Sequence, residues 1–155
     1  MKSVIGIDLG TTNCALAFTR DEAVEQFAIP QLVHENETRA EALLPSFVYL
    51  AQEAPIVGTF AQRKGLENAS RLVSSAKSWL SHAAVDRNVA ILPPNAPEGI
   101  QKISPVEASR LYLNHLRESW NAVHPDAPFD EYQVLVTVPA SFDRSEEHTS
   151  ELQSH

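Results

Sequence analysis

The stretch from Val4 to Asn13 constrains the fold most, because it joins an apolar strand to a tight turn rich in hydroxyl groups. The strand would carry the carboxylate of Asp8 to its end. Gly10 lets the backbone approach a ligand with no Cβ in the way, and Thr11 and Thr12 add hydroxyls beside their amides. The pattern predicts that residues Gly10 to Asn13 bind a polyphosphate, with Asp8 facing a divalent metal, Mg²⁺, through water. A plain hairpin turn is the alternative interpretation.

Further strands are predicted directly after this turn. Residues 14–18 are predicted to continue as a second strand. Apolar and polar residues alternate partly over residues 23–29, and this pattern, which stops at Pro30, predicts a third antiparallel strand. Residues 31–42 are polar without a clear period, and we predict a loop that leaves the first sheet. The first three elements are therefore expected to be an antiparallel meander.

The middle of the chain is expected to hold short elements. We predict strands at 43–50 and 55–58, and Pro45 lies near the start of the first of them. A helix is predicted at 59–66, a second short helix beginning near Ser74 or Ser75, and a loop at 93–99.

The clearest helix start is Ser104-Pro105-Val106-Glu107, with a serine N-cap, proline at the first helical position and a glutamate placed for a capping box. This helix should end before Pro125. Residues 132–138 are β-branched and almost continuously apolar, which predicts a strand covered on both faces. We expect that strand to join the sheet of the first hairpin.

Composition excludes several classes of protein. The net charge of -8 argues against a general nucleic-acid or anionic-membrane surface, and a single cysteine, Cys14, excludes an internal disulfide. No stretch approaches the roughly 20 apolar residues of a membrane span, and no signal peptide is evident, so a cytoplasmic protein is expected.

Other candidate residues have ordinary explanations. His34, His82, His115 and His124 show no metal-ligand spacing and are expected in loops or on helix surfaces. Trp79 and Trp120 are predicted to pack on apolar helical faces.

Five strings, in order, carry a resemblance: IGIDLGTTN, LPSFVYL, VGTFAQRKG, AKSWL and VLVTVPASFD. Together they resemble the heat-shock protein 70 chaperone family over residues 1–143. A DxGT loop alone also occurs in sugar kinases of the wider actin-like fold, whereas the ordered combination is specific. The resemblance ends at Asp143, because residues 144–155 resemble a translated sequencing adapter and are excluded from the expected fold.

The resemblance implies an α/β architecture of the actin-like (ribonuclease H-like) ATPase fold, first lobe only, with a mixed sheet, flanking helices and an inserted smaller subdomain. Residues 1–30 and 104–143 would form the larger subdomain, and residues 31–103 the insertion.

The resemblance also assigns roles to residues. Asp8 matches the aspartate near the metal-bound water, and Gly10, Thr11, Thr12 and Asn13 match the first phosphate loop. Lys77 falls at the catalytic lysine that approaches the γ-phosphate and the attacking water, and Pro139 matches a proline that relays nucleotide state. The implied cofactors are ATP or ADP and Mg²⁺. The alternatives are a solvated surface lysine at residue 77 and a simple strand terminator at residue 139.

The function implied is the nucleotide-binding part of an ATP-dependent chaperone, whose partners would be unfolded polypeptide, bound by a domain absent here, a J-domain co-chaperone and a nucleotide-exchange factor. A sugar kinase and a non-enzymatic binding module are the alternatives. Because only one wall of the site is expected, we predict that the chain alone binds ATP weakly and hydrolyses it negligibly. An exposed sheet face would also make it prone to aggregation.

Overall fold

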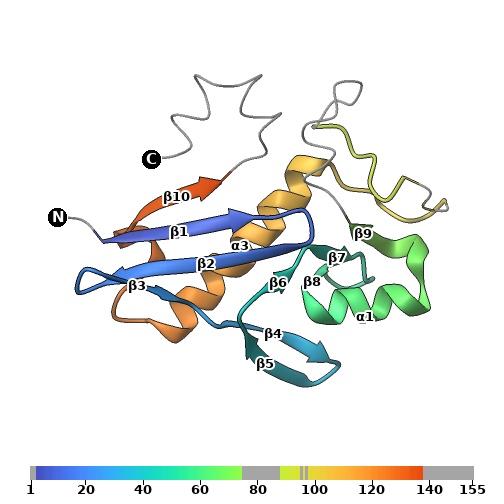
Figure 1. Ribbon diagram of the computed structural model, residues 1–155. Coiled ribbons are helices and arrows are strands. Elements are labelled where there is room, and N and C mark those ends of the chain that lie inside the picture. Colours follow the sequence, from blue (N-terminus) through green and yellow to red (C-terminus); the bar gives the residue numbers. More distant parts are fainter. Residues whose placement is uncertain (1–2, 75–87, 95, 97, 138–155) are drawn as a thin grey trace.

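The computed structural model describes residues 3–74, 88–94, 96 and 98–137, and in this part of the chain it is a mixed α/β structure (Figure 1). The strands are β1 (Val4–Leu9), β2 (Asn13–Arg20), β3 (Ala23–Gln26), β4 (Ile29–His34), β5 (Glu37–Glu41), β6 (Leu44–Pro45), β7 (Phe47–Tyr49), β8 (Ile56–Val57), β9 (Leu72–Ser74) and β10 (Gln133–Thr137). The α-helices are α1 (Thr59–Glu67) and α3 (Pro105–Val123), and short 3₁₀ turns lie at Ala69–Arg71 and Phe129–Glu131. None of the described helices is long and apolar enough to cross a membrane.

The main sheet has the strand order β10-β1-β2-β3, with β6 also paired to β2. Strands β1, β2 and β3 form the predicted antiparallel meander, and β10 runs parallel to β1. The last strand therefore joins the first hairpin, as predicted. Parallel pairing brings the carboxyl ends of β1 and β10 to the same edge of the sheet.

Burial of β10 differs from the prediction of a strand covered on both faces. Val134 and Val136 are half-buried against the core, whereas Gln133, Leu135 and Thr137 are exposed. The strand pairs only with β1 among the described residues, and one of its faces is open. Continuous apolarity was thus a misleading sign of two-sided burial at this strand.

Helix α3 covers one face of the main sheet (Figure 1). Its buried side chains Ala108, Tyr112, Leu116 and Trp120 belong to the same core as Ile5, Ile7 and Leu16 of the sheet. The predicted serine N-cap forms, because Ser104 accepts a hydrogen bond from the amide of Glu107 at 3.0 Å. The other half of the predicted capping box, a bond from the Ser104 amide to the Glu107 carboxylate, does not occur in the part of the chain that the structure describes. The Glu107 carboxylate pairs with Arg110, at 2.6 Å for the shorter bond.

Trp120 confirms its predicted packing role. It is fully buried, its ring lies 4.9 Å from that of Phe18 and 5.1 Å from that of Phe27, and its indole N–H donates to the carbonyl of Ala127. His124 stacks on it at 4.1 Å, so this histidine is a packing residue rather than an open surface residue.

The predicted loop at 31–42 is wrong, because β4 and β5 form an antiparallel hairpin there. Ile29, Gln31 and Val33 alternate as buried residues, but Pro30 suggested that the strand stopped, and the polar Gln31 concealed the period. The predicted strand at 23–29 accordingly splits into the whole of β3 and the first residue of β4, Ile29.

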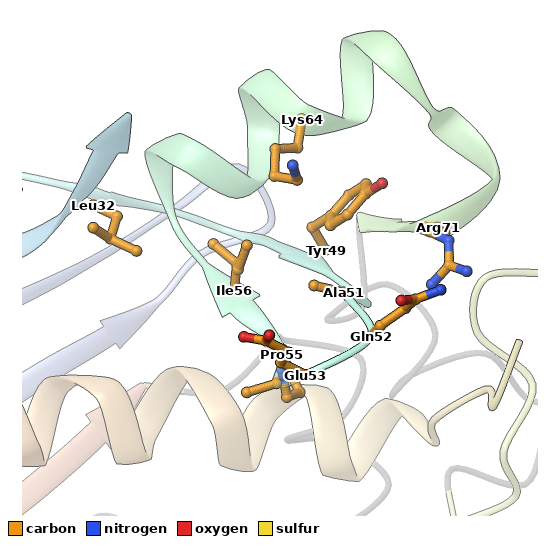
Figure 2. Close-up of a pocket in the computed structure, with 10 residues that line it drawn as sticks. Leu32, Tyr49, Ala51, Gln52, Glu53, Pro55, Ile56, Lys64 and Arg71 are labelled. Atoms are coloured by element: carbon orange, nitrogen blue, oxygen red, sulfur yellow. The ribbon is translucent and has the colours of Figure 1, made fainter. Parts of the chain in front are cut away.

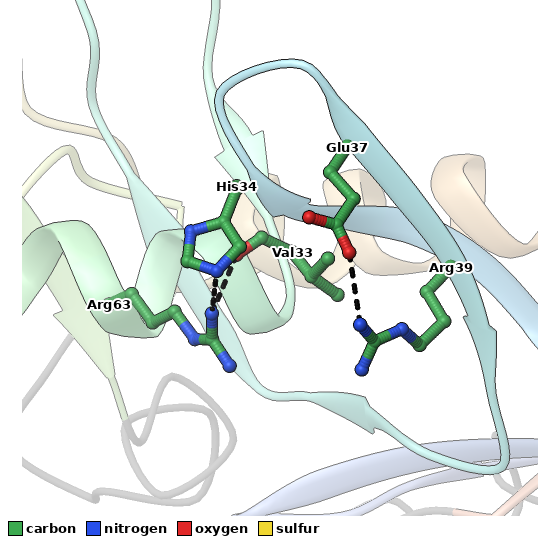
Figure 3. Close-up of polar contacts among 5 residues, drawn as sticks. All are labelled: Val33, His34, Glu37, Arg39 and Arg63. Atoms are coloured by element: carbon green, nitrogen blue, oxygen red, sulfur yellow. Dashed lines mark hydrogen bonds and ion pairs between the residues drawn. The ribbon is translucent and has the colours of Figure 1, made fainter.

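Helix α1 is held to this hairpin by Arg63 (Figure 3). Its guanidinium donates to the carbonyl of Val33 at 3.1 Å and lies 2.7 Å from Nε2 of His34. Glu37 and Arg39 pair at 2.9 Å within β5, at the surface. The hairpin and α1 therefore form one packed unit.

A small sheet of order β8-β7-β9 completes the middle region. Residues 72–74 are a strand, and the helix predicted to begin near Ser74 or Ser75 lies outside the described residues, together with Trp79 and His82.

Candidate phosphate-binding site

The turn after β1 is closed by its own backbone. The amide of Gly10 donates to the carbonyl oxygen of Asn13 at 2.9 Å, and a Cβ on Gly10 would collide with that same oxygen. Only glycine fits this approach without a shift of the turn. The steric cause is thus the carbonyl of Asn13, whereas the approach of a ligand, for which the sequence suggested glycine, stays a prediction.

Thr11 and Thr12 form the outer part of the turn. Both are exposed, and neither donates a hydrogen bond to any group in the part of the chain that the structure describes. Their amides and hydroxyls are therefore available to an oxyanion.

The inner side of the turn is bound by Ser46, which lies between β6 and β7. Its hydroxyl donates to the carbonyl of Gly10 at 2.8 Å, and its amide donates to the carbonyl of Thr12 at 2.9 Å. Ser46 is not among the site residues predicted from the sequence. Its only signal is the position of a serine between apolar strand residues, and 36 residues separate it from Gly10.

Asp8 lies one residue before the end of β1, and its side chain is exposed. The hydroxyl of Thr137 donates to Oδ1 of Asp8 at 2.9 Å, and the two residues are register partners in the parallel pair β1–β10. Thr137 was also missed, although it is the last residue of β10 and parallel strands end at one edge. The bond fixes the direction of a carboxylate that remains open to water.

Glycine and alanine residues line the sheet face beside Asp8, and the larger Val24 and Gln26 lie at its border. A cavity of about 430 Å³ lies there, opposite α3, bordered by Gly6, Asp8, Ala15, Ala17 and Thr137 among others. The short side chains leave room above the carboxylate. A ligand at the turn would thus meet an accessible acid beside exposed amide donors.

A larger cavity, of about 640 Å³, lies elsewhere, between β7, the loop at 51–55 and α1 (Figure 2). Lys64 lies on its wall with Nζ 5.3 Å from the centre of the Tyr49 ring, and Arg71 donates to the carbonyl of Leu50. It contains none of the predicted site residues. Cavity volume alone would therefore indicate a binding site in a different part of the molecule from the turn.

Three residues of α3, none of them in the turn, have shifted pKa values. Desolvation lowers the pKa of His115, whose Nε2 lies 2.9 Å from the carbonyl of Pro30. Desolvation, and then the nearby Cys14, raise the pKa of Tyr112, whose buried hydroxyl lacks a hydrogen-bond partner among the described residues. The hydrogen bond from Arg110 lowers the pKa of Glu107. All three shifts have structural causes.

The described residues contain no group of three or more His, Cys, Asp or Glu side chains that could hold a metal. Asp8 is a single carboxylate at the turn. A divalent ion at this place would take most of its ligands from water and from the oxygens of a bound phosphate, as Mg²⁺ commonly does.

The structure thus brings Asp8 and residues Gly10 to Asn13 together at one edge of the main sheet. Lys77 and Pro139, the other two predicted site residues, lie outside the described residues.

Comparison with known proteins supplies the family. The model of the Hsp70 protein family matches residues 4–150, which includes the first residues of the tail compared above with an adapter. Among curated relatives, the chain is 32% identical to a chaperone protein HscA homolog of Cupriavidus necator, and 31% and 28% identical to those of Bordetella pertussis and Photobacterium profundum.

These alignments cover 90–92% of this chain but only 23% of each relative. The chain therefore spans about a quarter of the length of the curated relatives that it matches. Since the family model covers nearly all of the chain, and the fold places the expected turn at the end of β1, the chain belongs to the Hsp70 protein family and corresponds to its N-terminal region, which implies the actin-like fold.

Proposed function

We propose that this chain is the first part of the nucleotide-binding domain of an ATP-dependent chaperone, and that the turn Gly10–Asn13 binds nucleotide phosphates. The observation that carries the proposal is the placement of an oriented, exposed Asp8 beside two exposed threonines, in a chain of the Hsp70 family. Family membership favours this function over a sugar kinase. Residues 1–30 and 104–143 are the proposed larger subdomain, and residues 31–103 the insertion.

The donor set fits a Mg²⁺-bound polyphosphate. The amides and hydroxyls of Thr11 and Thr12 can donate hydrogen bonds to phosphate oxygens. The carboxylate of Asp8, oriented by Thr137, can accept hydrogen bonds from water molecules around a divalent cation. When bound, Mg²⁺ neutralises phosphate charge and supplies the electrostatic part of phosphoryl transfer.

The residues of the chain would bind and orient the reactants. The turn would hold phosphate oxygens, and Asp8, oriented by Thr137, would offer a hydrogen-bond acceptor to water around a divalent ion. The roles proposed for Lys77, near the γ-phosphate and attacking water, and for Pro139, in relaying nucleotide state, rest on the family pattern alone.

Partners are proposed by the same route. The relatives named above are chaperones, which supports unfolded polypeptide as the client and a J-domain protein and an exchange factor as co-chaperones of a longer protein. A cytoplasmic location belongs to the same proposal.

The chain alone should bind ATP weakly and turn it over negligibly. Asp8, Thr11 and Thr12 are exposed, so water competes for every group that they offer to phosphate. ATP hydrolysis by the purified chain, compared with Lys77→Ala, tests this. Robust turnover that Lys77→Ala abolishes would contradict it. Mg²⁺-dependent binding at the turn without turnover is expected, whereas sugar-dependent ATP consumption would favour the kinase.

A further inference from the structure

Ser46 has an unusual position for a small polar residue. It is only 2% exposed, yet it uses both of its hydrogen-bond donors on one short turn, the hydroxyl on the carbonyl of Gly10 and the amide on the carbonyl of Thr12. It comes from the junction of β6 and β7, so a segment distant in sequence holds the inner side of the turn.

These two bonds determine where the amides of the turn point. In a trans peptide unit the C=O and the following N–H point in opposite directions. Because Ser46 draws the carbonyls of Gly10 and Thr12 toward itself, the amides of Thr11 and Asn13 are directed away from it. Alternate peptide units of the turn thus present donors on the side opposite Ser46.

The surroundings of Ser46 make these bonds difficult to replace. Sγ of the buried Cys14 lies 3.5 Å from the Ser46 hydroxyl, and Cys14 pairs with Leu44 of β6. Water has little access to a hydroxyl at 2% exposure, so a lost hydrogen bond there is poorly compensated by solvent.

We propose that Ser46 is the positioning residue of the phosphate-binding turn, which aims the amides of Thr11 and Asn13 at phosphate oxygens. The inference rests on the proposed function and deepens it. The ligand class is a Mg²⁺-bound diphosphate or triphosphate. Ser46 does not touch the ligand and acts only through the two carbonyls that it binds.

The test compares Ser46→Ala with Ser119→Ala in the 155-residue chain. Ser119 is a matched control, because it is 8% exposed and its hydroxyl also donates to a backbone carbonyl, that of Pro30, within 3.3 Å. Both variants lose one buried serine hydroxyl, and urea unfolding measures the cost of each. Only one of the two serines contacts the turn.

Backbone amide NMR spectra supply the specific readouts, without ligand and during titration with Mg²⁺–pyrophosphate. We expect Ser46→Ala to shift the amides of Thr11 and Asn13 and to weaken pyrophosphate binding by about tenfold, the equivalent of one lost hydrogen bond. Ser119→Ala should do neither. Ser46→Thr, which keeps the hydroxyl, should restore most of the affinity. If Ser46→Ala unfolds the chain, Ser46→Cys replaces it in the comparison with Ser119→Ala, because a thiol is a weaker hydrogen-bond donor than a hydroxyl.

The outcomes separate the inference from the proposed function. Unchanged turn amides and unchanged affinity in Ser46→Ala would overturn the role of Ser46, even with a wild-type chain that binds pyrophosphate at the turn. A wild-type chain that binds none would overturn the proposed function, while amide shifts confined to Ser46→Ala would still support the positioning of the turn. Equal losses of affinity in Ser46→Ala and Ser119→Ala would show a general stability effect and contradict the inference.

Discussion

Thr137 donates a hydrogen bond to the carboxylate of Asp8 at 2.9 Å, although 129 residues separate the two in the sequence. The contact exists because β1 and β10 are parallel neighbours and both end at this edge of the sheet. It links the closing strand of the sheet to the acid that we propose as the metal-facing group.

Removal of the Asp8 charge should weaken Mg²⁺-dependent phosphate binding more than removal of its partner. Asp8→Asn keeps the shape and loses the charge, whereas Thr137→Val keeps the charge and loses the orienting hydroxyl. We expect about a tenfold or larger loss of pyrophosphate affinity for Asp8→Asn and a smaller loss for Thr137→Val, measured by NMR titration. Equal affinity of wild type and Asp8→Asn would remove Asp8 from the site.

Gly10 and Gly6 provide a matched pair on the same strand and turn. A Cβ on Gly10 would collide with the carbonyl of Asn13, whereas a Cβ on Gly6 meets nothing within 4 Å. Gly10→Ala should distort the turn, cost about 1–3 kcal/mol of unfolding free energy and reduce phosphate binding. Gly6→Ala should be neutral or slightly stabilising. Urea unfolding of both variants gives the answer, and similar values for the two would refute the steric explanation.

Gln31 should be a major contributor to the stability of the middle region. It is 1% exposed, donates to the carbonyls of Ile29 and Leu43, and accepts a bond from the amide of Thr59 at the start of α1. The hydroxyl of Thr59 can donate either to Gln31 or to the nearer Glu41. Gln31→Leu would remove a bond to the buried carbonyl of Ile29 and part-buried bonds to Leu43 and Thr59, at a cost of about 2–3 kcal/mol in urea unfolding. Gln26→Leu is the control, since Gln26 makes its bond to Ala42 at the surface. A cost for Gln31→Leu no greater than for Gln26→Leu would mean that the buried bonds of Gln31 do not stabilise the middle region.

His115 should make stability depend on pH. Burial lowers its pKa from the usual 6.5, while the bond to the Pro30 carbonyl and the neighbouring Glu118 oppose that shift. Below pH 6.5 the unfolded chain binds a proton that the native chain does not, so the unfolding free energy falls as the pH decreases toward the lower native pKa. Urea unfolding at several pH values from 7.5 to 5 is therefore expected to show a steeper decline for wild type than for His115→Gln. Parallel curves would exclude His115 as the cause.

The core between α3 and the main sheet should be especially sensitive to substitution at Trp120. Trp120→Ala removes a fully buried ring that contacts Phe18 and Phe27, and should cost about 3–5 kcal/mol. Val24→Ala, at a residue 74% exposed, should stay within about 0.5 kcal/mol of wild type. A small cost for Trp120→Ala in urea unfolding would mean that the α3–sheet core is not as described.

Local features of the site could be predicted from sequence, and long-range ones could not. The turn at Gly10 and the cap at Ser104 depend on residues within four positions of each other, so their chemistry is visible in a short window. Ser46 reaches the turn only through the pairing of β6 with β2, and Thr137 reaches Asp8 only through the pairing of β10 with β1. No spacing in the sequence specifies those contacts.

The β4–β5 hairpin was missed for a different reason. Pro30 lies inside β4, and the fully buried polar side chain of Gln31 breaks the apolar pattern that reveals a strand. The buried amide is tolerated because Thr59, Ile29 and Leu43 satisfy it, and those partners become neighbours only in the folded chain. Tertiary hydrogen bonds to Gln31 therefore allow strand β4 to form despite its polar residue.

The most direct test of the central claim is an amide NMR titration of the isotope-labelled 155-residue chain with Mg²⁺–ATP, repeated on Asp8→Asn. We expect weak binding, with the largest shifts at Gly10 to Asn13 in wild type and a marked loss of those shifts in Asp8→Asn. Shifts centred instead on Lys64 and Arg71 at the larger cavity, or the same response in both proteins, would contradict the central claim.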